Sequence, residues 1–164
     1  MPLSYKAPLR DIRFLTNEVF NYPEHYKTLK SGENADPETV DMMLESFADY
    51  CSNVLMPLYQ SGDDEGCHFD KGVVTTPKGF KEAYKQYCEL GFPMPMSVNL
   101  IKSEMMGTAN WAFAMYPGLS VGCMNTIMQY GTAEQKATYM PALVEGRWSG
   151  TMCLTEPQCG TDLG

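Results

Sequence analysis

Helix-start signals recur along this chain and constrain it to a largely helical fold. Asp36 precedes Pro37, which joins a favourable N-cap to a residue suited to the first helical position. The pair Thr76-Pro77 repeats this pattern. The run from Thr132 to Gln135 has the spacing of a capping box, in which the two side chains satisfy each other's backbone N–H groups. The sequence therefore predicts several helices with defined starting points.

Apolar periodicity places the helices between these signals. Spacings of three and four residues put apolar side chains on one helix face. The longest such face follows Asp36 and comprises Val40, Met43, Leu44, Phe47, Cys51, Val54 and Leu55. We expect this helix to end near Pro57, and Pro117 and Gly118 to interrupt a later apolar stretch. Further helices are expected at 9–20, 77–90, 97–106, 119–130 and 133–145, with polar connections at 21–35 and 59–76. Val73 to Thr75, within the second connection, is expected to form a short extended piece.

The last stretch of the sequence changes character. Trp148 to Thr155 is rich in β-branched, apolar and small residues, which is typical of a strand, and Pro157 and Gly160 then predict a turn. A strand that runs into such a turn offers backbone N–H groups and hydroxyls to a phosphate or to the polar edge of a flat cofactor. We therefore expect an all-α fold in three parts: an N-terminal extension with a short helix at 1–35, a helical domain at 36–147 and the start of a β domain at 148–164.

Charge, cysteine spacing and hydropathy exclude several classes of protein. A net charge of −8 argues against a nucleic-acid surface, which needs clustered Lys and Arg. The cysteines form no CxxC pair and no apolar signal-peptide core precedes them, so we expect reduced thiols and a cytoplasmic location. Cys67 and His68 are a single pair of soft ligands, which does not predict a metal site. No apolar run is long enough to predict a membrane span.

Few side chains suggest catalysis by themselves. Glu156 stands beside the predicted turn and could act as a general base, but a lone carboxylate more often fixes a turn through hydrogen bonds. Cys153 and Cys159 lack a neighbouring base or cation that would activate a thiol. Trp111 and Tyr116 could stack on a ring, although aromatic side chains are far more common as core residues. These residues alone do not define a reaction.

Two blocks of sequence resemble the N-terminal part of the acyl-CoA dehydrogenase family. The first block is Gly-Thr-Ala-Glu-Gln-Lys at 131–136, followed by Tyr-Met-Pro-Ala-Leu at 139–143 and Glu-Gly at 145–146. The second is Cys-Leu-Thr-Glu-Pro at 153–157, followed by Gly-Thr-Asp at 160–162. The helix order from residue 36 onward is similar as well. The opening Tyr-Lys-Ala-Pro-Leu-Arg-Asp at 5–11 resembles the extra segment of a long subgroup that includes the 3-methylthiopropanoyl-CoA dehydrogenases.

This resemblance implies both a fold and a cofactor. The fold would continue from the helical domain into a middle β domain and a C-terminal four-helix domain, and the cofactor would be FAD. Matched to the family motif, Met152, Leu154 and Thr155 would lie along the flavin. Gly160 and Thr161 would approach the FAD pyrophosphate, and Thr161 would also touch the acyl-CoA substrate. Glycine permits close approach of the backbone, and a hydroxyl donates a hydrogen bond to a phosphate oxygen.

The resemblance also implies a reaction, the dehydrogenation of an acyl-CoA thioester between its α and β carbons. In the family a glutamate removes the α-proton while the β-hydride passes to the flavin, and the electrons leave to an electron-transfer flavoprotein. That glutamate belongs to the C-terminal domain, so we expect no catalytic residue within 1–164. We expect the chain to be a fragment that is inactive and does not retain FAD alone, and its uncovered faces to favour a homo-oligomer.

Three features depart from the family pattern. Cys159 stands where the family usually has a smaller residue. A Gly-rich stretch expected between the helices at 77–90 and 97–106 is replaced by Gly91-Phe92-Pro93. The sequence ends at Gly164, ahead of the catalytic base. An alternative hypothesis is a stand-alone helical module that binds other proteins through its methionine-rich faces. A sequence that ends just after one strand favours the fragment, because a single unpaired strand is not stable.

Overall fold

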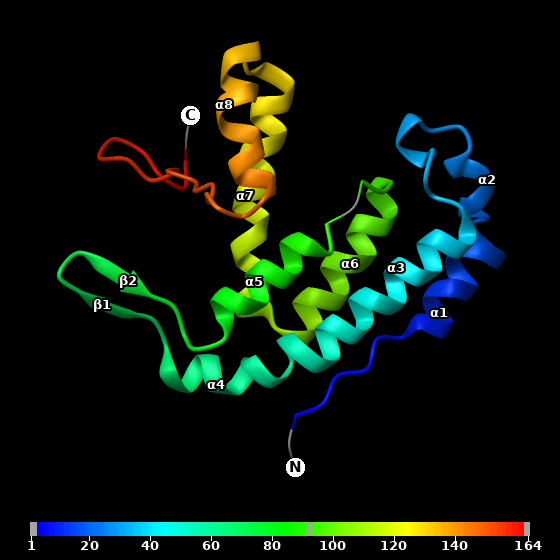
Figure 1. The fold of residues 1–164 in the computed structure, drawn as a ribbon, viewed down its shortest axis with the longest axis horizontal. Coiled ribbons are helices and arrows are strands. Elements are labelled where there is room, and N and C mark those ends of the chain that lie inside the picture. The colour runs from blue at the N-terminus through cyan, green and yellow to red at the C-terminus, as the bar shows by residue number, and fades with distance from the viewer. Residues whose placement is uncertain (1–2, 92, 163–164) are drawn as a thin grey trace. The chain divides into compact units, whose positions relative to one another are not determined.

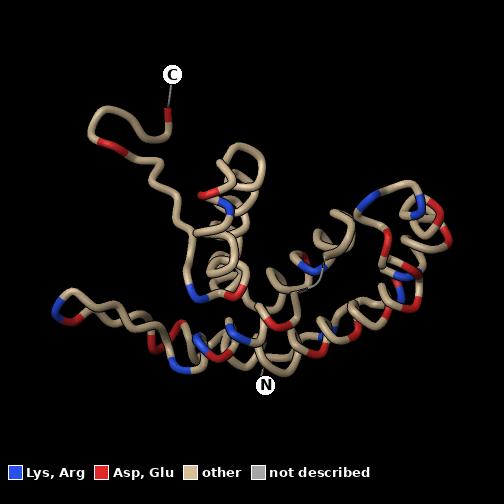
Figure 2. Tube along the Cα trace, turned by 45° about the horizontal axis from the view of Figure 1, so that its top comes forward, with Lys and Arg blue, Asp and Glu red and all other residues tan. Residues whose placement is uncertain are grey.

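The computed structural model describes residues 3–91 and 93–162, and most of them lie in helices (Figure 1). They form two compact units, Met1–Ala114 and Met115–Gly164. The long helix α7 (Trp111–Tyr130) includes residues of both units. Figure 2 shows Lys and Arg interspersed with Asp and Glu along the described trace, without one basic region. This distribution agrees with the net charge of −8.

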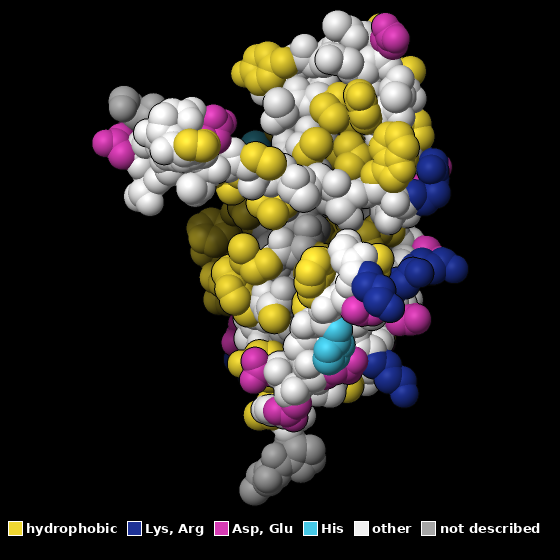
Figure 3. All heavy atoms as spheres, turned by 90° about the vertical axis from the view of Figure 1, so that its left-hand side faces the viewer, with side chains coloured by type: hydrophobic (Ala, Val, Ile, Leu, Met, Phe, Trp, Pro, Cys, Tyr) yellow, Lys and Arg dark blue, Asp and Glu magenta, His cyan; other side chains and the backbone are white. Residues whose placement is uncertain are grey.

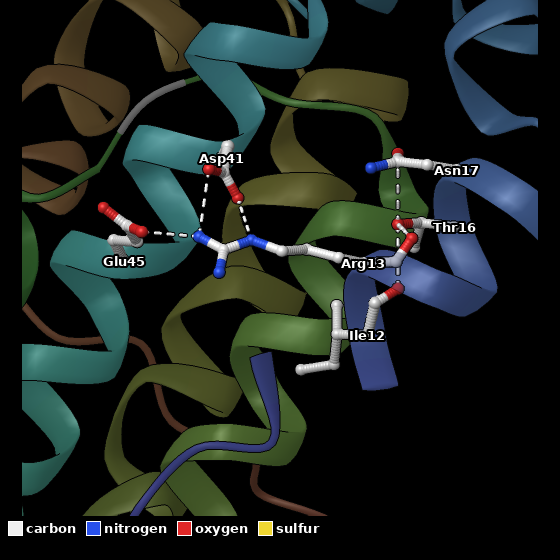
Figure 4. Close-up of polar contacts among 6 residues, drawn as sticks. All are labelled: Ile12, Arg13, Thr16, Asn17, Asp41 and Glu45. Atoms are coloured by element: carbon white, nitrogen blue, oxygen red, sulfur yellow. Dashed lines mark hydrogen bonds and ion pairs between the residues drawn. The ribbon is translucent and has the colours of Figure 1, made fainter. Parts of the chain in front are cut away.

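The helix expected near the N-terminus is present in two parts. α1 (Leu9–Arg13) continues into a π-helical turn, η1 (Phe14–Val19). The Arg13 guanidinium donates hydrogen bonds to the carboxylates of Asp41 and Glu45 (Figure 4), with 2.9 Å between Nη2 and Asp41 Oδ2. These two carboxylates raise the pKa of Arg13. The ion pairs hold this stretch against the long helix that follows, although none of its own side chains is fully buried.

The polar connection expected at 21–35 contains more structure than predicted. It holds α2 (Tyr22–Tyr26) and the 3₁₀ turn η2 (Lys30–Gly32). Tyr26 is only 3% exposed, and its hydroxyl lies 2.7 Å from Ser97 Oγ. Gly32 is required here, since a Cβ atom would lie 1.9 Å from the carbonyl oxygen of Tyr26. A helix of five residues is too short to show periodicity, which is why the sequence pattern missed it.

The long amphipathic helix is confirmed, but it does not end where expected. α3 (Pro37–Tyr50) starts at Asp36, whose Oδ1 accepts a hydrogen bond from the Thr39 backbone N–H at 3.0 Å. It runs through the π-helical turn η3 (Cys51–Leu55) into α4 (Pro57–Glu65). Pro57 lies in the first turn of α4, a position that tolerates its missing N–H, so it does not stop the chain's helical course. The prediction of a loop across 59–65 is therefore wrong.

A short hairpin follows α4. β1 (His68–Asp70) pairs antiparallel with β2 (Val73–Thr75), and Phe69 is opposite Val74. Lys71 and Gly72 have φ values of 48° and 84°, the left-handed conformation of a two-residue hairpin turn. The extended piece expected at 73–75 is thus confirmed as one strand of this hairpin.

The next two helices begin at other residues than predicted. α5 (Phe80–Glu89) starts after Gly79, which has a φ of 89°, and Thr76 does not cap it. α6 (Met96–Ala109) starts after Pro95, and Gly107 does not break it. The predicted departure at Gly91-Phe92-Pro93 lies between these helices, and Phe92 is outside the described residues. The prediction of both helices and of their order is confirmed, whereas the predicted capping residues are wrong.

The core of the first unit is built mainly from α3, η3, α5 and α6. Tyr50 adds a buried hydrogen bond, since its hydroxyl donates to the Ala83 carbonyl at 2.8 Å. Burial of one large apolar side chain contributes about 1.5–3 kcal/mol, so this cluster supplies most of the driving force for folding the unit. Its least exposed apolar members are Leu44, Phe47, Cys51, Leu55, Ala83, Val98, Met105, Ala109 and Phe113.

Two polar residues lie inside this core. Asn110 is fully buried and joins two segments: its Nδ2 donates to the Leu55 carbonyl and its Oδ1 accepts from the Phe113 N–H, each at 3.0 Å. Lys102 is 9% exposed and lies over the ring of Phe47. Asn110 therefore fixes the start of α7 against the end of η3.

In the second unit, α7 is followed by α8 (Ala133–Val144). Pro117 lies inside α7, so the expected interruption at Pro117 and Gly118 is wrong. The capping box of α8 is confirmed: Thr132 Oγ1 accepts from the Gln135 N–H at 3.2 Å, and Gln135 Oε1 accepts from the Thr132 N–H at 2.8 Å. On α8 itself, Leu143 is buried, whereas Tyr139 is 45% exposed.

Candidate functional site

The segment from Trp148 to Thr155 was expected to form a strand, but it has no paired strand beside it in the part of the chain that the structure describes. Residues 151–155 pair with no other described segment. Directly after it, Glu156 and Cys159 form an isolated antiparallel bridge, in which the Glu156 N–H donates to the Cys159 carbonyl at 2.7 Å. The turn is therefore confirmed, and the strand from Trp148 to Thr155 is not. A strand is defined by its partner, and the described chain supplies none here.

The beginning of this stretch is held against α7. The Gly150 N–H donates to the hydroxyl of Ser120 at 3.0 Å, and Ser120 is only 2% exposed. A Cβ atom on Gly150 would lie 2.6 Å from the Cβ of Cys123, so only glycine fits this close approach. The Trp148 N–H also donates to the Ala142 carbonyl at 3.0 Å. These contacts set where the stretch leaves the α7–α8 pair.

The five predicted cofactor-binding residues follow this anchor. Met152 is 64% exposed and Leu154 43% exposed, and Thr155 and Thr161 are exposed as well. A Cβ atom on Gly160 would lie 3.3 Å from both Oγ1 and Cγ2 of Thr155. The structure thus places Gly160 beside the Thr155 side chain, across the turn. It leaves the apolar side chains of Met152 and Leu154 open to solvent.

The remaining polar groups of this segment act locally. Gln158 Nε2 donates to Glu156 Oε2 at 2.7 Å, across the same turn. This contact supports a turn-fixing role for Glu156 over a catalytic one. Cys153 and Cys159 are free thiols. Within 3–91 and 93–162, no three His, Cys, Asp or Glu side chains gather closely enough to hold a metal ion.

Several residues that position the site escaped sequence reasoning. Ser120 and Cys123 lie in an apolar helix and gave no sign that they contact Gly150, because they are 30 and 27 positions away from it in the sequence. No helix among the described residues combines the length and apolar character that a membrane span requires.

The sequence profile of the acyl-CoA dehydrogenase N-terminal domain matches residues 37–147, which covers α3 to α8. This range includes most of the core of the first unit and the helix pair that anchors Gly150. The chain therefore belongs to the acyl-CoA dehydrogenase family and contains its N-terminal helical domain.

Similarity to individual proteins extends beyond this domain. The chain is 33% identical to a 3-methylmercaptopropionyl-CoA dehydrogenase of Ruegeria pomeroyi, over 98% of this chain and 29% of that protein. It is 29% identical to a butyryl-CoA dehydrogenase of Syntrophomonas wolfei and 30% identical to a broad-specificity linear acyl-CoA dehydrogenase of Mycobacterium tuberculosis, again over 98% of this chain. It spans less than a third of the length of each relative, 28–29%.

These alignments also contain residues that the chain lacks. The alignment with the Ruegeria protein has 173 positions, whereas this sequence has 164 residues in all. The relative therefore has additional residues within the matched region.

Proposed function

We propose that this chain is the N-terminal part of an FAD-dependent acyl-CoA dehydrogenase, which removes hydrogen from the α and β carbons of an acyl-CoA thioester. Family membership supports the reaction class. The position of Gly160 beside the Thr155 side chain is the observation that carries the cofactor assignment. It places a hydroxyl beside a residue without a side chain at a tight turn, which suits a ligand that must approach the backbone closely.

The side chains and backbone groups of residues 152–161 are chemically suited to FAD. When bound, the flavin supplies the acceptor for the hydride removed from the substrate. Met152 and Leu154 present exposed apolar side chains that suit the face of an aromatic ring system. The Thr155 hydroxyl and the N–H groups around it are suited to the polar edge of the flavin. Gly160 and Thr161 would face the pyrophosphate, and Thr161 would also contact acyl-CoA.

Other parts of the proposed function lie outside residues 1–164. The general base would come from the C-terminal domain, and Glu156 is not assigned to that role. The electrons would pass to an electron-transfer flavoprotein. The enzyme would be cytoplasmic and homo-oligomeric.

An exposed apolar surface supports the proposed oligomer. Figure 3 shows apolar side chains gathered over the α7–α8 pair. Of the residues in these two helices, Met115, Met128 and Val144 are each more than half exposed. This unit therefore offers surface for further protein to cover.

The test uses the full-length protein with Thr155→Val or Gly160→Leu. We expect purified protein to contain FAD and to oxidise acyl-CoA in the presence of an electron acceptor. Each variant should weaken FAD binding about tenfold or more, the effect of one lost polar contact or one blocked approach. Thr151→Val makes the same chemical change in the same segment and should leave the flavin in place.

Two outcomes would reject the proposal. A full-length protein without flavin absorbance would exclude the cofactor and would favour the alternative, a helical module that binds other proteins. Unchanged FAD affinity in both variants would remove this segment from the site. A protein consisting of residues 1–164 should not retain FAD, since most of the proposed site would be missing.

A further inference from the structure

A groove in the first unit leaves part of an apolar helix face uncovered. The stretch from Leu9 to Val19 turns Ile12 toward the core, whereas Leu15 is 45% exposed and Val19 52% exposed. Leu100 of α6 is 62% exposed on the opposite wall. The helices that carry these two walls are drawn in blue (the N-terminal helix) and green (α6) in Figure 1. The apolar lining of the groove includes Ile12, Leu15, Phe20, Tyr22, Leu100 and Ile101.

The walls of this groove are fixed by contacts within the chain. Phe20 and Tyr22 stack with their ring centres 5.5 Å apart and their planes inclined by 23°. Behind them, the Tyr26 hydroxyl lies 2.7 Å from Ser97 Oγ, which ties the segment after η1 to α6. Arg13 binds Asp41 of α3 on the other side of the helix (Figure 4). The groove therefore keeps its form without an occupant, which lowers the cost of binding one.

The rim of the groove is negatively charged. Asp11 and Glu104 line it, and no Lys, Arg or His is among the described residues of the lining. Glu104 forms no ion pair with another described residue. Asp11 lies 3.3 Å from Arg10, but their side chains are 69% and 96% exposed, and such surface pairs contribute little. Both carboxylates are thus available to a positively charged partner.

We propose that this groove binds an amphipathic helix of a partner protein, with apolar side chains in the groove and Lys or Arg beside Asp11 and Glu104. An apolar helix face that enters a preformed groove is a common mode of peptide recognition, and the charged rim would select its flanks. A two-fold contact between copies of this chain would place the same acidic rims opposite each other, which disfavours self-association through this groove. The inference does not rest on the proposed enzyme activity.

The test measures binding of a labelled synthetic helix of Leu and Lys to the full-length protein by fluorescence anisotropy. A matched helix with Glu in place of every Lys is the control peptide. We expect saturable binding of the Lys peptide, at least about tenfold weaker binding of the Glu peptide, and weaker binding at high salt. Leu100→Ser should reduce the affinity about tenfold, and Glu104→Gln about two- to fivefold.

Two control variants distinguish peptide binding in the groove from non-specific electrostatic binding to an acidic protein. Met42→Ser removes an apolar side chain that is 61% exposed outside the groove, and Glu82→Gln removes an exposed charge from α5. Neither should change binding. Equal effects of Glu82→Gln and Glu104→Gln, equal binding of the two peptides, or no saturable binding would overturn the proposal. Sedimentation could also show that the unsubstituted protein is a dimer and that Leu100→Ser is not. That result would overturn the proposal, because the occupant of the groove would then be a second copy of this chain.

Discussion

The ammonium group of Lys102 lies 5.0 Å from the centre of the Phe47 ring, inside the apolar core. Val98, Lys102 and Met105 lie on the same side of α6, so the lysine holds a position that the pattern assigns to an apolar residue. The ring offsets a small part of the desolvation of the cation, and no carboxylate pairs with Lys102 among the described residues. Burial accordingly lowers the pKa of Lys102.

Lys102→Met should stabilise the protein at neutral pH by about 1–2 kcal/mol, because it removes a desolvated charge and keeps the volume of the side chain. The pKa of Lys102 is lower in the folded than in the unfolded state, so the unfolded chain binds more protons between the two values. Stability of the unsubstituted protein should therefore rise with pH across that window, and the Met variant should lose this component.

Denaturant unfolding of the full-length protein at several pH values measures both effects. Lys85→Met is the control, since the Lys85 side chain is 80% exposed and its pair with Glu89 is a surface pair. The control should shift stability by less than about 0.5 kcal/mol. Destabilisation by Lys102→Met equal to that of a typical core substitution would contradict the prediction and would show that the charge of Lys102 is stabilised by a partner group.

Asn110→Ala should destabilise the protein by about 2–4 kcal/mol. The substitution leaves the buried Leu55 carbonyl and Phe113 N–H without their partners, and an unsatisfied buried group costs more than a hydrogen bond gains. Asn125→Ala makes the same substitution at an exposed position within α7 and should have almost no effect. Thermal unfolding followed by circular dichroism compares the two. Equal melting temperatures would contradict the proposed role of Asn110.

Thr132→Ala should cost about 1 kcal/mol, the usual value for the loss of a helix N-cap. The threonine hydroxyl and Gln135 satisfy two N–H groups at the start of α8, so removal of either side chain frays this end. Thr138→Ala, at an exposed position inside α8, should instead be neutral or slightly stabilising because alanine favours a helix. Protection of the first-turn amides against hydrogen exchange distinguishes local fraying from global unfolding.

Much of the helical fold was predictable because its signals are local. The Asp36 N-cap and the Thr132 capping box depend on residues three positions apart, and both are confirmed. The helix boundaries that were predicted wrongly are not decided by the residue type alone. Pro57 lies in the first turn of α4, where its missing N–H is tolerated, so helix α4 can follow η3 directly. Pro117 lies inside α7, where the rest of the helix overrides the local preference of proline.

The residues of the candidate site were chosen by resemblance, and their role in binding FAD stays a prediction. The structure places Gly160 beside the Thr155 side chain, so that a Cβ atom on Gly160 would lie 3.3 Å from it. The strand before them could not be judged from its own residues, because a strand forms only against a partner segment. The anchor at Gly150 depends on Ser120, which is distant in the sequence and has no distinctive neighbours there. Contacts of that kind become visible only in three dimensions.

Gly150→Ala should disturb the candidate site without touching its residues. The added Cβ would lie 2.6 Å from the Cβ of Cys123 and 3.0 Å from the Cα of Ser120, so the extended stretch after Gly150 must move away from α7. We expect destabilisation by about 1–3 kcal/mol and a lower FAD content of the full-length protein. Gly118→Ala is the matched control, since a Cβ there meets nothing within 4 Å. Flavin absorbance per protein gives the measurement, and equal FAD content in the two variants would show that the contact between Gly150 and α7 does not position the segment that follows it.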